Sequence, residues 1–250
     1  MTKIIGVISR KGGTGKTTTT QALGNGLTQR GYKVLFVDLD SQGNLTYALG
    51  GTPQTKTIFG VLTGETDIKK AIQHTPQGDL ITYSENLGVM DKVLTNTGNE
   101  FKLKENLDLI KSQYDYILID TSAQIGILLA NTLTACNSVI ITVQAEIFSI
   151  KGIDQLNGAI EPVKKYFNRD LVIEGILATR YSARSILSRD MRENLENSAN
   201  KLNTKVFKTS IRECIALRES ATLQRSIFDY APKSNGAKDY KAFIDELIGE

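Results

Sequence analysis

Residues 10–18 read RKGGTGKTT, a run whose residue types and spacing suit phosphate binding. Its glycines would let the backbone wrap N–H groups around phosphate oxygens, and a helix starting near Lys16 would add the positive end of its dipole. Lys16 would reach the β and γ phosphates, and the Thr17 hydroxyl would ligate Mg²⁺. A glycine turn that happens to precede a lysine is the alternative. Because the loop follows an apolar run and opens a helical pattern, as a phosphate loop requires, we expect nucleotide contacts from Gly12, Gly13, Thr14, Gly15, Lys16, Thr17 and Thr18.

The start of this loop departs from the usual pattern. A phosphate loop is normally written G-x-x-x-x-G-K-[ST], and the position of its first glycine is here occupied by Arg10. A second lysine, Lys11, follows it. A second cation beside a phosphoryl group in transfer stabilises the developing charge, as an arginine finger does. The loop is therefore either a damaged nucleotide site or a site that uses an additional lysine.

Three aspartates could complete a magnesium site. Asp38 and Asp40 lie two residues apart in VDLDSQGN, and Asp120 ends the apolar run YILID. Side chains at this spacing can point the same way, so Asp40 could hold an attacking water and Asp38 could support the metal shell. Asp120 matches the terminal carboxylate of a Walker B strand. A capped turn and an ordinary strand end are the structural alternatives. The predicted metal ligands are Thr17, Asp38, Asp40 and Asp120.

These groups need strands to position them. Short apolar runs, typical of strands buried on both faces, recur along the chain, and helical patterns separate most of them. This alternation predicts an α/β fold with three layers, in which a mostly parallel twisted sheet carries helices on both faces. Ligands of such sheets bind outside the carboxyl ends of the strands, where the glycine loop and the three aspartates fall. The expected strands are residues 3–9, 34–38, 116–120, 138–142 and 172–179. In the weaker stretch between residues 50 and 105, we expect short helices at 55–65 and 87–96 and an edge strand at 79–83.

Composition favours one soluble domain. With 250 residues, of which 40% are hydrophobic, the chain can form one sizeable core, so we expect a single domain over residues 1–250. The two cysteines, Cys136 and Cys214, lack the spacing of metal ligands. His74 lies in a polar stretch that we interpret as a loop without a catalytic role. The cysteines suggest no disulfide framework, so we expect a reducing, cytoplasmic setting. No apolar window approaches the roughly 18 residues of a membrane span, so we expect a soluble protein without a membrane partner.

Five motifs together carry a family resemblance. In their order and type they resemble the ParA/Soj chromosome and plasmid partition ATPases, which belong to a deviant Walker A group of P-loop NTPases that also contains MinD and the nitrogenase iron protein. The resemblance covers nearly the whole chain. The motifs are KGGTGKTT, VDLDSQGN, YILID, VQAEIFSIKG (143–152) and IFDYAPKSNGAKDY (227–240).

The resemblance implies an ATP- and Mg²⁺-dependent homodimer in which two subunits sandwich the nucleotides. Lys11 would reach the phosphates bound by the other subunit, and Asp40 would position water, so Lys11, Lys16 and Asp40 are the implied catalytic residues. Arg180 and Pro232, with neighbouring Thr179, would border the adenine. The family usually follows its Walker B aspartate with two prolines after a threonine, whereas this chain has Ser122 and Ala123 there. A loop without prolines is less rigid, which affects the expected hydrolysis rate more than nucleotide binding.

Positive charge is concentrated in residues 180–225. This segment holds ten basic and five acidic residues, although the formal net charge of the whole chain is only +3. Such a patch could bind duplex DNA through phosphates without reading sequence, which agrees with the family's behaviour. A solvated helix face is the alternative for any one arginine. The predicted DNA contacts are Arg184, Arg189, Arg192 and Arg218.

The resemblance thus implies a DNA partition motor. A ParB-like centromere-binding protein would stimulate hydrolysis, and the protein would be cytoplasmic and associated with the nucleoid. A MinD-like ATPase that positions cargo or division machinery at a membrane is the alternative, but the acidic residues of KDYKAFIDELIGE offset its lysines, so we expect that segment to dock on the core. An iron–sulfur reductase would need suitably placed cysteines, and a tyrosine autokinase a C-terminal tyrosine cluster; the chain has neither.

Overall fold

The computed structural model describes residues 1–52, 55–144, 149–181 and 187–249, with the side chains at 149–150 and 187–191 left out. Its centre is a sheet of eight strands in the order β3-β4-β2-β5-β1-β6-β7-β8. All neighbouring strands are parallel except β3 and β4, which form an antiparallel hairpin. The strands are β1 (Lys3–Ile8), β2 (Val34–Leu39), β3 (Ile72–Thr75), β4 (Gly78–Ile81), β5 (Tyr116–Thr121), β6 (Ser138–Gln144), β7 (Val172–Tyr181) and β8 (Ile211–Arg212).

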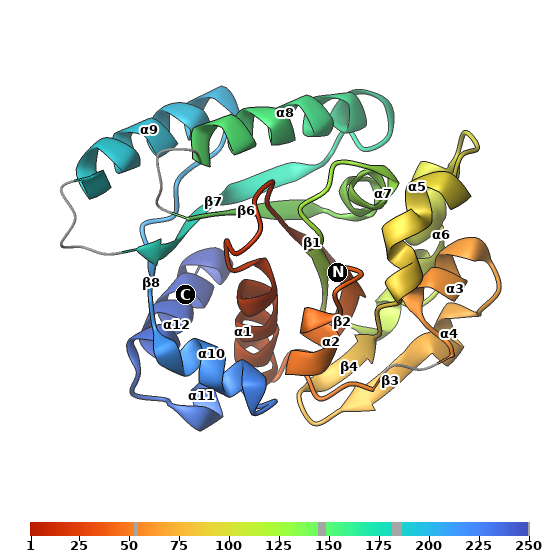
Figure 1. Ribbon diagram of the computed structural model, residues 1–250, viewed down its shortest axis with the longest axis horizontal. Helices are drawn as coiled ribbons and strands as arrows, with labels where there is room; N and C mark the ends of the chain where they lie inside the picture. The colour runs from red at the N-terminus through yellow and green to blue at the C-terminus, as the bar shows by residue number, and fades with distance from the viewer. Residues whose placement is uncertain (53–54, 145–148, 182–186, 250) are drawn as a thin grey trace.

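Helices cover both faces of this sheet, and each face has its own apolar cluster (Figure 1). One face carries α1 (Lys16–Gln29), α2 (Asn44–Ala48), α10 (Ile215–Thr222), α11 (Ile227–Tyr230) and α12 (Asn235–Ile248). The other carries α3 (Ile58–Thr63), α4 (Ile68–Ala71), α5 (Met90–Val93), α6 (Lys102–Asp108), α7 (Ile127–Ala135), α8 (Ser149–Tyr166) and α9 (Leu187–Lys201). Three short 3₁₀ turns complete the described elements: η1 (Glu85–Val89), η2 (Asn99–Phe101) and η3 (Lys111–Gln113).

The central strands are mostly apolar because helices cover both of their faces, and their polar residues lie near the carboxyl ends. Every residue of β2 and of β5 is buried. Such strands read as continuous apolar runs rather than alternating patterns. The α/β class, the parallel sheet and all five expected strands are therefore confirmed.

The edge of the sheet differs from the prediction. The segment expected as an edge strand forms β4, but β3 pairs outside it and is the true edge. His74 belongs to β3 and pairs with Asp79 of β4, so its interpretation as a loop residue was wrong. The short, half-exposed IQHT segment has too few apolar residues to stand out as a strand, and only its pairing with β4 defines it.

Helix α1 packs between the sheet and α12. Gly24 faces the ring of Phe36, and a Cβ at residue 24 would lie 2.1 Å from the ring atom Cζ, so only glycine permits this approach. On its other side α1 meets α12, where the Tyr240 hydroxyl and the Thr19 hydroxyl lie 3.0 Å apart. Phe243 and Ile244 of α12 are fully buried. The expected docking of the C-terminal helix on the core is confirmed.

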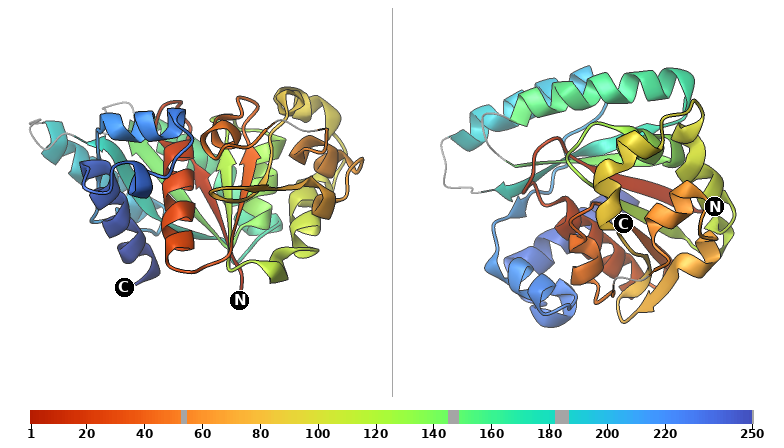
Figure 2. Two further views of the ribbon diagram at one scale, coloured as in Figure 1. Left: turned by 90° about the horizontal axis from the view of Figure 1, so that it is seen from below. Right: turned by 45° about the vertical axis from the view of Figure 1, so that its right-hand side comes forward.

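The parallel strands direct the candidate site to one edge of the molecule. Both chain ends lie at the bottom of the left view in Figure 2, and β1 runs from that edge towards the loop that opens α1. No helix within the described ranges is long and apolar enough to cross a membrane.

Candidate functional site

The loop between β1 and α1 has the backbone that its glycines predict. Gly13 and Gly15 have φ of 76° and 78°, in the left-handed region that side chains disfavour. Gly15 is the N-cap residue of α1, which starts at Lys16. The first N–H groups of the helix therefore face the end of the sheet, where they can bind an anion.

Hydroxyl groups tie this loop to the neighbouring strands. The Thr179 hydroxyl of β7 donates to the carbonyl of Thr14 at 2.8 Å and lies 3.1 Å from the carbonyl of Val143. The hydroxyls of Thr14 and Thr142 lie 3.1 Å apart. These contacts hold the loop in a fixed shape before any ligand binds, which lowers the entropic cost of binding.

Thr17 and Asp120 lie together at the predicted metal position. The Thr17 hydroxyl donates to Oδ2 of Asp120 at 2.6 Å, and Asp120 is fully buried at the end of β5. Asp38 is its neighbour across the sheet, in register on β2. Burial raises the pKa of both carboxyls, and their mutual repulsion raises the pKa of Asp120 further.

Lys16 brings a buried cation to the phosphate loop. Only 8% of it is exposed, and this burial lowers the pKa of its ammonium group, whereas Asp120 and Asp40 act in the opposite direction. A buried ammonium gains most from an anionic partner that replaces its lost hydration. Phosphate groups would supply that partner.

The donor set fits Mg²⁺ bound together with a nucleotide. The Thr17 hydroxyl and the Asp120 carboxylate are the hard oxygen ligands that Mg²⁺ prefers. In the part of the chain that the structure describes, no three His, Cys, Asp or Glu side chains cluster so as to hold a metal by themselves. Mg²⁺ commonly uses one or two carboxylates and takes its remaining ligands from water and substrate phosphates.

The two aspartates of VDLDSQGN have different surroundings. Asp40 lines the cavity beside the loop, and its Oδ1 accepts from the backbone N–H of Gln42 at 3.1 Å. Asp38 is fully buried and does not line that cavity. One oxygen of Asp38 accepts from the N–H and hydroxyl of Thr46, both at 2.8 Å, and the other accepts from the N–H of Asp40 at 3.2 Å. Asp38 thus anchors the segment that carries Asp40.

A cavity of about 590 Å³ opens next to the phosphate loop. This volume lies in the range of small-molecule sites. Among the predicted nucleotide-binding residues, Lys11 and Thr14 do not line it, and neither does Pro232, which is exposed before α12. The residues predicted for the nucleotide or its metal that line it are Gly12, Gly13, Gly15, Lys16, Thr17, Thr18, Asp40, Thr179 and Arg180.

Several residues of this cavity had no signal in the sequence. They come from α2, from β8, from α10 and from the two residues between β8 and α10, and the approach of these segments to α1 depends on packing and not on a local motif. Arg218, which we predicted as a DNA contact, belongs to this wall. Arg180, beside it, has φ of 50° and pairs with Glu213 at 3.0 Å. The wall includes Tyr47, Ala48, Ile211, Arg212, Glu213, Cys214, Leu217, Arg218, Ala221 and Thr222.

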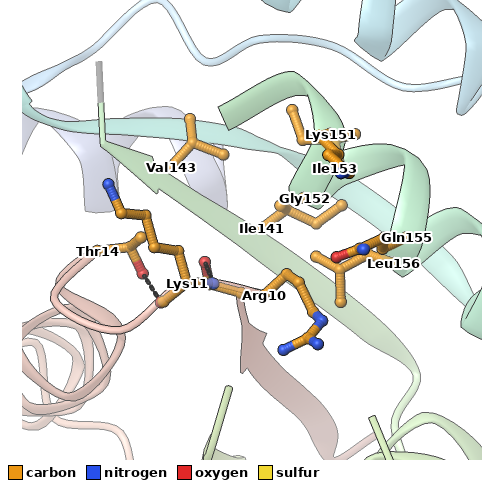
Figure 3. Close-up of a pocket in the computed structure, with 11 residues that line it drawn as sticks. Arg10, Lys11, Thr14, Ile141, Val143, Lys151, Gly152, Ile153, Gln155 and Leu156 are labelled. Atoms are coloured by element: carbon orange, nitrogen blue, oxygen red, sulfur yellow. Dashed lines mark hydrogen bonds between the residues drawn. The ribbon is translucent and has the colours of Figure 1, made fainter. Parts of the chain in front are cut away.

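Lys11 faces a different space from Lys16. It is exposed, and it lines a second cavity of about 190 Å³ between the loop and α8, together with Arg10 and Lys151. Figure 3 shows the side chains of Arg10 and Lys11 extending in different directions, with Lys11 alongside Thr14. Arg10 donates to the carbonyl of Ala123 at 2.9 Å and so braces the loop after Asp120. The residue in place of the first glycine therefore has a structural partner of its own.

Of the four predicted DNA contacts, the structure describes the side chains of Arg192 and Arg218 only, and these two lie on different helices. Arg184 lies outside the described residues, and for Arg189 the structure describes only its place in α9. Arg192 of α9 is exposed and pairs with Glu196 at 3.2 Å. Arg218 lies at the nucleotide-sized cavity instead.

The chain is similar to known proteins along nearly its whole length. An AAA domain family matches residues 2–173. The sporulation initiation inhibitor protein Soj of Bacillus subtilis is 36% identical over 99% of this chain and 98% of Soj. The chromosome partitioning protein ParA of Myxococcus xanthus is 33% identical over 98% of this chain and 88% of ParA. The structure of Mycobacterium smegmatis cobyrinic acid a,c-diamide synthase with bound ADP and magnesium has a TM-score of 0.85 and 32% identity, covering 99% of this chain and 94% of that chain.

Proposed function

Because this chain belongs to the ParA/Soj family of partition ATPases, within the AAA domain family that matches residues 2–173, we propose that it works as an ATP-switched DNA partition motor. ATP and Mg²⁺ drive the formation of a sandwich homodimer. The dimer binds duplex DNA without sequence preference. Hydrolysis, stimulated by a ParB-like centromere-binding protein, releases monomers that must exchange nucleotide before they bind again. The protein is cytoplasmic and associated with the nucleoid.

One observation carries the dimer. Lys11 and Lys16 belong to the same loop, but Lys16 lines the large cavity and Lys11 lines the smaller one. This difference supports a role for Lys16 at the phosphates of its own subunit. Lys11 is exposed at the surface of the loop, where a second subunit can bring its own nucleotide to it. Hydrolysis and dimerisation are then linked, because the second cation arrives only with the partner.

Other residues of this chain bind the phosphates, hold the metal and orient the attacking water. The loop N–H groups and Lys16 bind and orient the phosphates, and Thr17 and Asp120 hold Mg²⁺. When bound, Mg²⁺ supplies charge neutralisation on the phosphate oxygens. Asp40, half-buried at the cavity and fixed by the Gln42 N–H, orients the attacking water and takes its proton at a carboxylate oxygen.

The packing of the C-terminal helix argues against the MinD-like membrane alternative. A MinD-like protein would need a basic amphipathic segment with an accessible apolar face. In α12 the apolar residues Tyr240, Phe243 and Ile244 are buried against α1 and the sheet. A membrane could take up this face only if the helix left the core.

DNA co-sedimentation in the presence of ATP or ADP tests the proposed function. We expect binding with Mg-ATP and much weaker binding with Mg-ADP, because only the ATP dimer doubles the basic surface. Equal binding with both nucleotides, or binding with neither, would overturn the DNA-motor proposal. Vesicle co-sedimentation of the same samples separates the MinD-like alternative, which predicts ATP-dependent recovery with lipid.

A further inference from the structure

The turn between β3 and β4 places one side chain among three helices. Gln77 is buried, with 9% of its surface exposed. Its Oε1 accepts from Nε2 of Gln21 at 3.0 Å and from Nδ2 of Asn25 at 2.8 Å, both on α1. Its Nε2 donates to the carbonyl of Ala48 in α2 at 2.8 Å and to the carbonyl of Gln224 after α10 at 3.0 Å. One amide thus makes all four of the hydrogen bonds available to it.

Each of the three helices that this amide joins borders the large cavity. α1 begins at the phosphate loop, α2 contributes Tyr47 and Ala48, and α10 contributes residues from Leu217 to Thr222. Gln77 itself does not line the cavity. It comes from the edge of the sheet, and Figure 1 shows the β3–β4 hairpin beside α2.

Helices α2 and α10 depend on tertiary contacts for their stability and position. They have five and eight residues, and helices this short are marginal without tertiary contacts. A second link joins them directly, from the Tyr47 hydroxyl to the carbonyl of Thr222 at 3.2 Å. The end of α10 is also held in an uncommon conformation, since Gln224 has φ of 54°. Apolar packing of Leu45 and Leu49 and the hydrogen bond from Gln21 to the carbonyl of Ala48 hold α2 on α1, and the contacts of Gln77 add the link that includes α10.

We propose that Gln77 is a positioning residue for nucleotide binding: it holds α2 and α10 against α1 and keeps the cavity in the shape that accepts the nucleotide. The inference rests on the proposed nucleotide binding. It assigns an effect on that binding to a residue that does not line the cavity. Without this amide, α2 keeps the hydrogen bond from Nε2 of Gln21 to the carbonyl of Ala48 at 3.0 Å but loses the one from Gln77, and α10 loses its link through Gln224, so both helices are held less firmly against α1 and the nucleotide must draw them back when it binds. The free energy needed to order α2 and α10 is then taken from the binding free energy, so the affinity for the nucleotide falls.

The test is calorimetric titration of Mg-ADP into the full chain and into Gln77→Met. Methionine has a similar length and is apolar, so the variant loses all four hydrogen bonds with little change in volume. We expect the Kd for Mg-ADP to rise roughly tenfold, which is the affinity equivalent of about one lost hydrogen bond. ADP is used because hydrolysis then plays no part in the measurement.

Asn25→Ala is the matched control. It removes one hydrogen bond from the same amide network, on the α1 side, and leaves the links from Gln77 to α2 and α10 in place. We expect it to lower Tm, but by less than Gln77→Met, which loses four hydrogen bonds, and to change the Kd by less than about twofold. If Asn25→Ala weakens Mg-ADP binding as much as Gln77→Met does, Gln77 has only a structural role and the inference is wrong.

A second variant, Gln77→Glu, tests the inference if Gln77→Met does not fold. Gln77→Glu keeps acceptors towards α1 but turns acceptor oxygens towards the carbonyls of Ala48 and Gln224, so we expect it to weaken Mg-ADP at least as much. Wild-type affinity in either folded Gln77 variant overturns the inference while leaving the proposed function intact. Failure of the unmodified chain to bind Mg-ADP would instead refute the proposed function.

Discussion

At the residue scale, the two lysines of the phosphate loop have different proposed roles: Lys16 binds the phosphates of its own subunit, and Lys11 contacts those of the other subunit. Lys16→Ala should abolish Mg-ATP binding, or weaken it by at least about a hundredfold, because a buried cation beside the phosphates is lost. Lys11→Ala should bind Mg-ATP within about threefold of the parent and fail to form the competent dimer. Nucleotide titration and light scattering with Mg-ATP measure the two effects. Normal dimerisation and turnover by Lys11→Ala would show that the lysine does not act in trans.

Asp120 gives a prediction on pH. Burial and the neighbouring Asp38 raise its native pKa, so the native protein keeps a proton that the unfolded chain releases at its ordinary pKa of about 4. Unfolding therefore releases this proton between that value and the raised native pKa, and the free energy of unfolding of the ligand-free protein falls with pH across this window.

Asp120→Asn removes the free-energy cost of ionising this buried carboxyl, and it also removes a proposed metal ligand. At pH 8 without Mg²⁺ we expect a higher Tm than in the parent chain, by about 2–4 °C for each kcal/mol of relieved penalty, and a loss of Mg²⁺-dependent nucleotide affinity. Thermal scans at pH 5 and pH 8 measure the difference, which should be larger at pH 8. Asp170→Asn, at an exposed carboxylate, is the control and should show no such gain. A Tm for Asp120→Asn below that of the parent at pH 8 would contradict the buried-charge argument.

At the element scale, glycines in two helices should respond oppositely to alanine. In α1 a Cβ at Gly24 would collide with Phe36, and overpacking of about 1–3 kcal/mol should exceed the gain of about 1 kcal/mol in helix propensity. In α8 a Cβ at Gly158 meets nothing within 4 Å, so Gly158→Ala should stabilise by about 0.5–1 kcal/mol. Urea unfolding measures both. A stabilising Gly24→Ala would mean that α1 does not approach β2 this closely.

The elements also show why some predictions succeeded. β2 and β5 are buried on both faces, and their continuous apolar runs are visible in the sequence. The four residues of β3 lack such a run, and their strand state comes from pairing with β4. Local patterns predict elements that carry their own burial signal, whereas an edge strand depends on a partner.

At the scale of the whole molecule, charge distribution governs the proposed DNA binding. Arg192→Glu on the exposed face of α9 should weaken ATP-dependent DNA binding several-fold and lower the slope of log K against log salt by about 1, without changing nucleotide affinity. Lys70→Glu makes the same change in charge on α4, beside the opposite edge of the sheet, and is the control. Equal weakening by both variants would indicate an effect of net charge alone, and no weakening would identify Arg192 as a solvated residue.

The sequence by itself determined the α/β sheet, the phosphate loop and the Thr17–Asp120 pair at its carboxyl edge. Those features depend on short motifs and on the order of apolar runs, which tertiary packing does not alter. Only the tertiary structure placed Arg218 at the cavity, directed Asp38 to Thr46, and brought Gln77 to α1, α2 and α10. These contacts join residues far apart in the chain, and their partners are set by how the helices pack on the sheet, a quantity that no local spacing encodes.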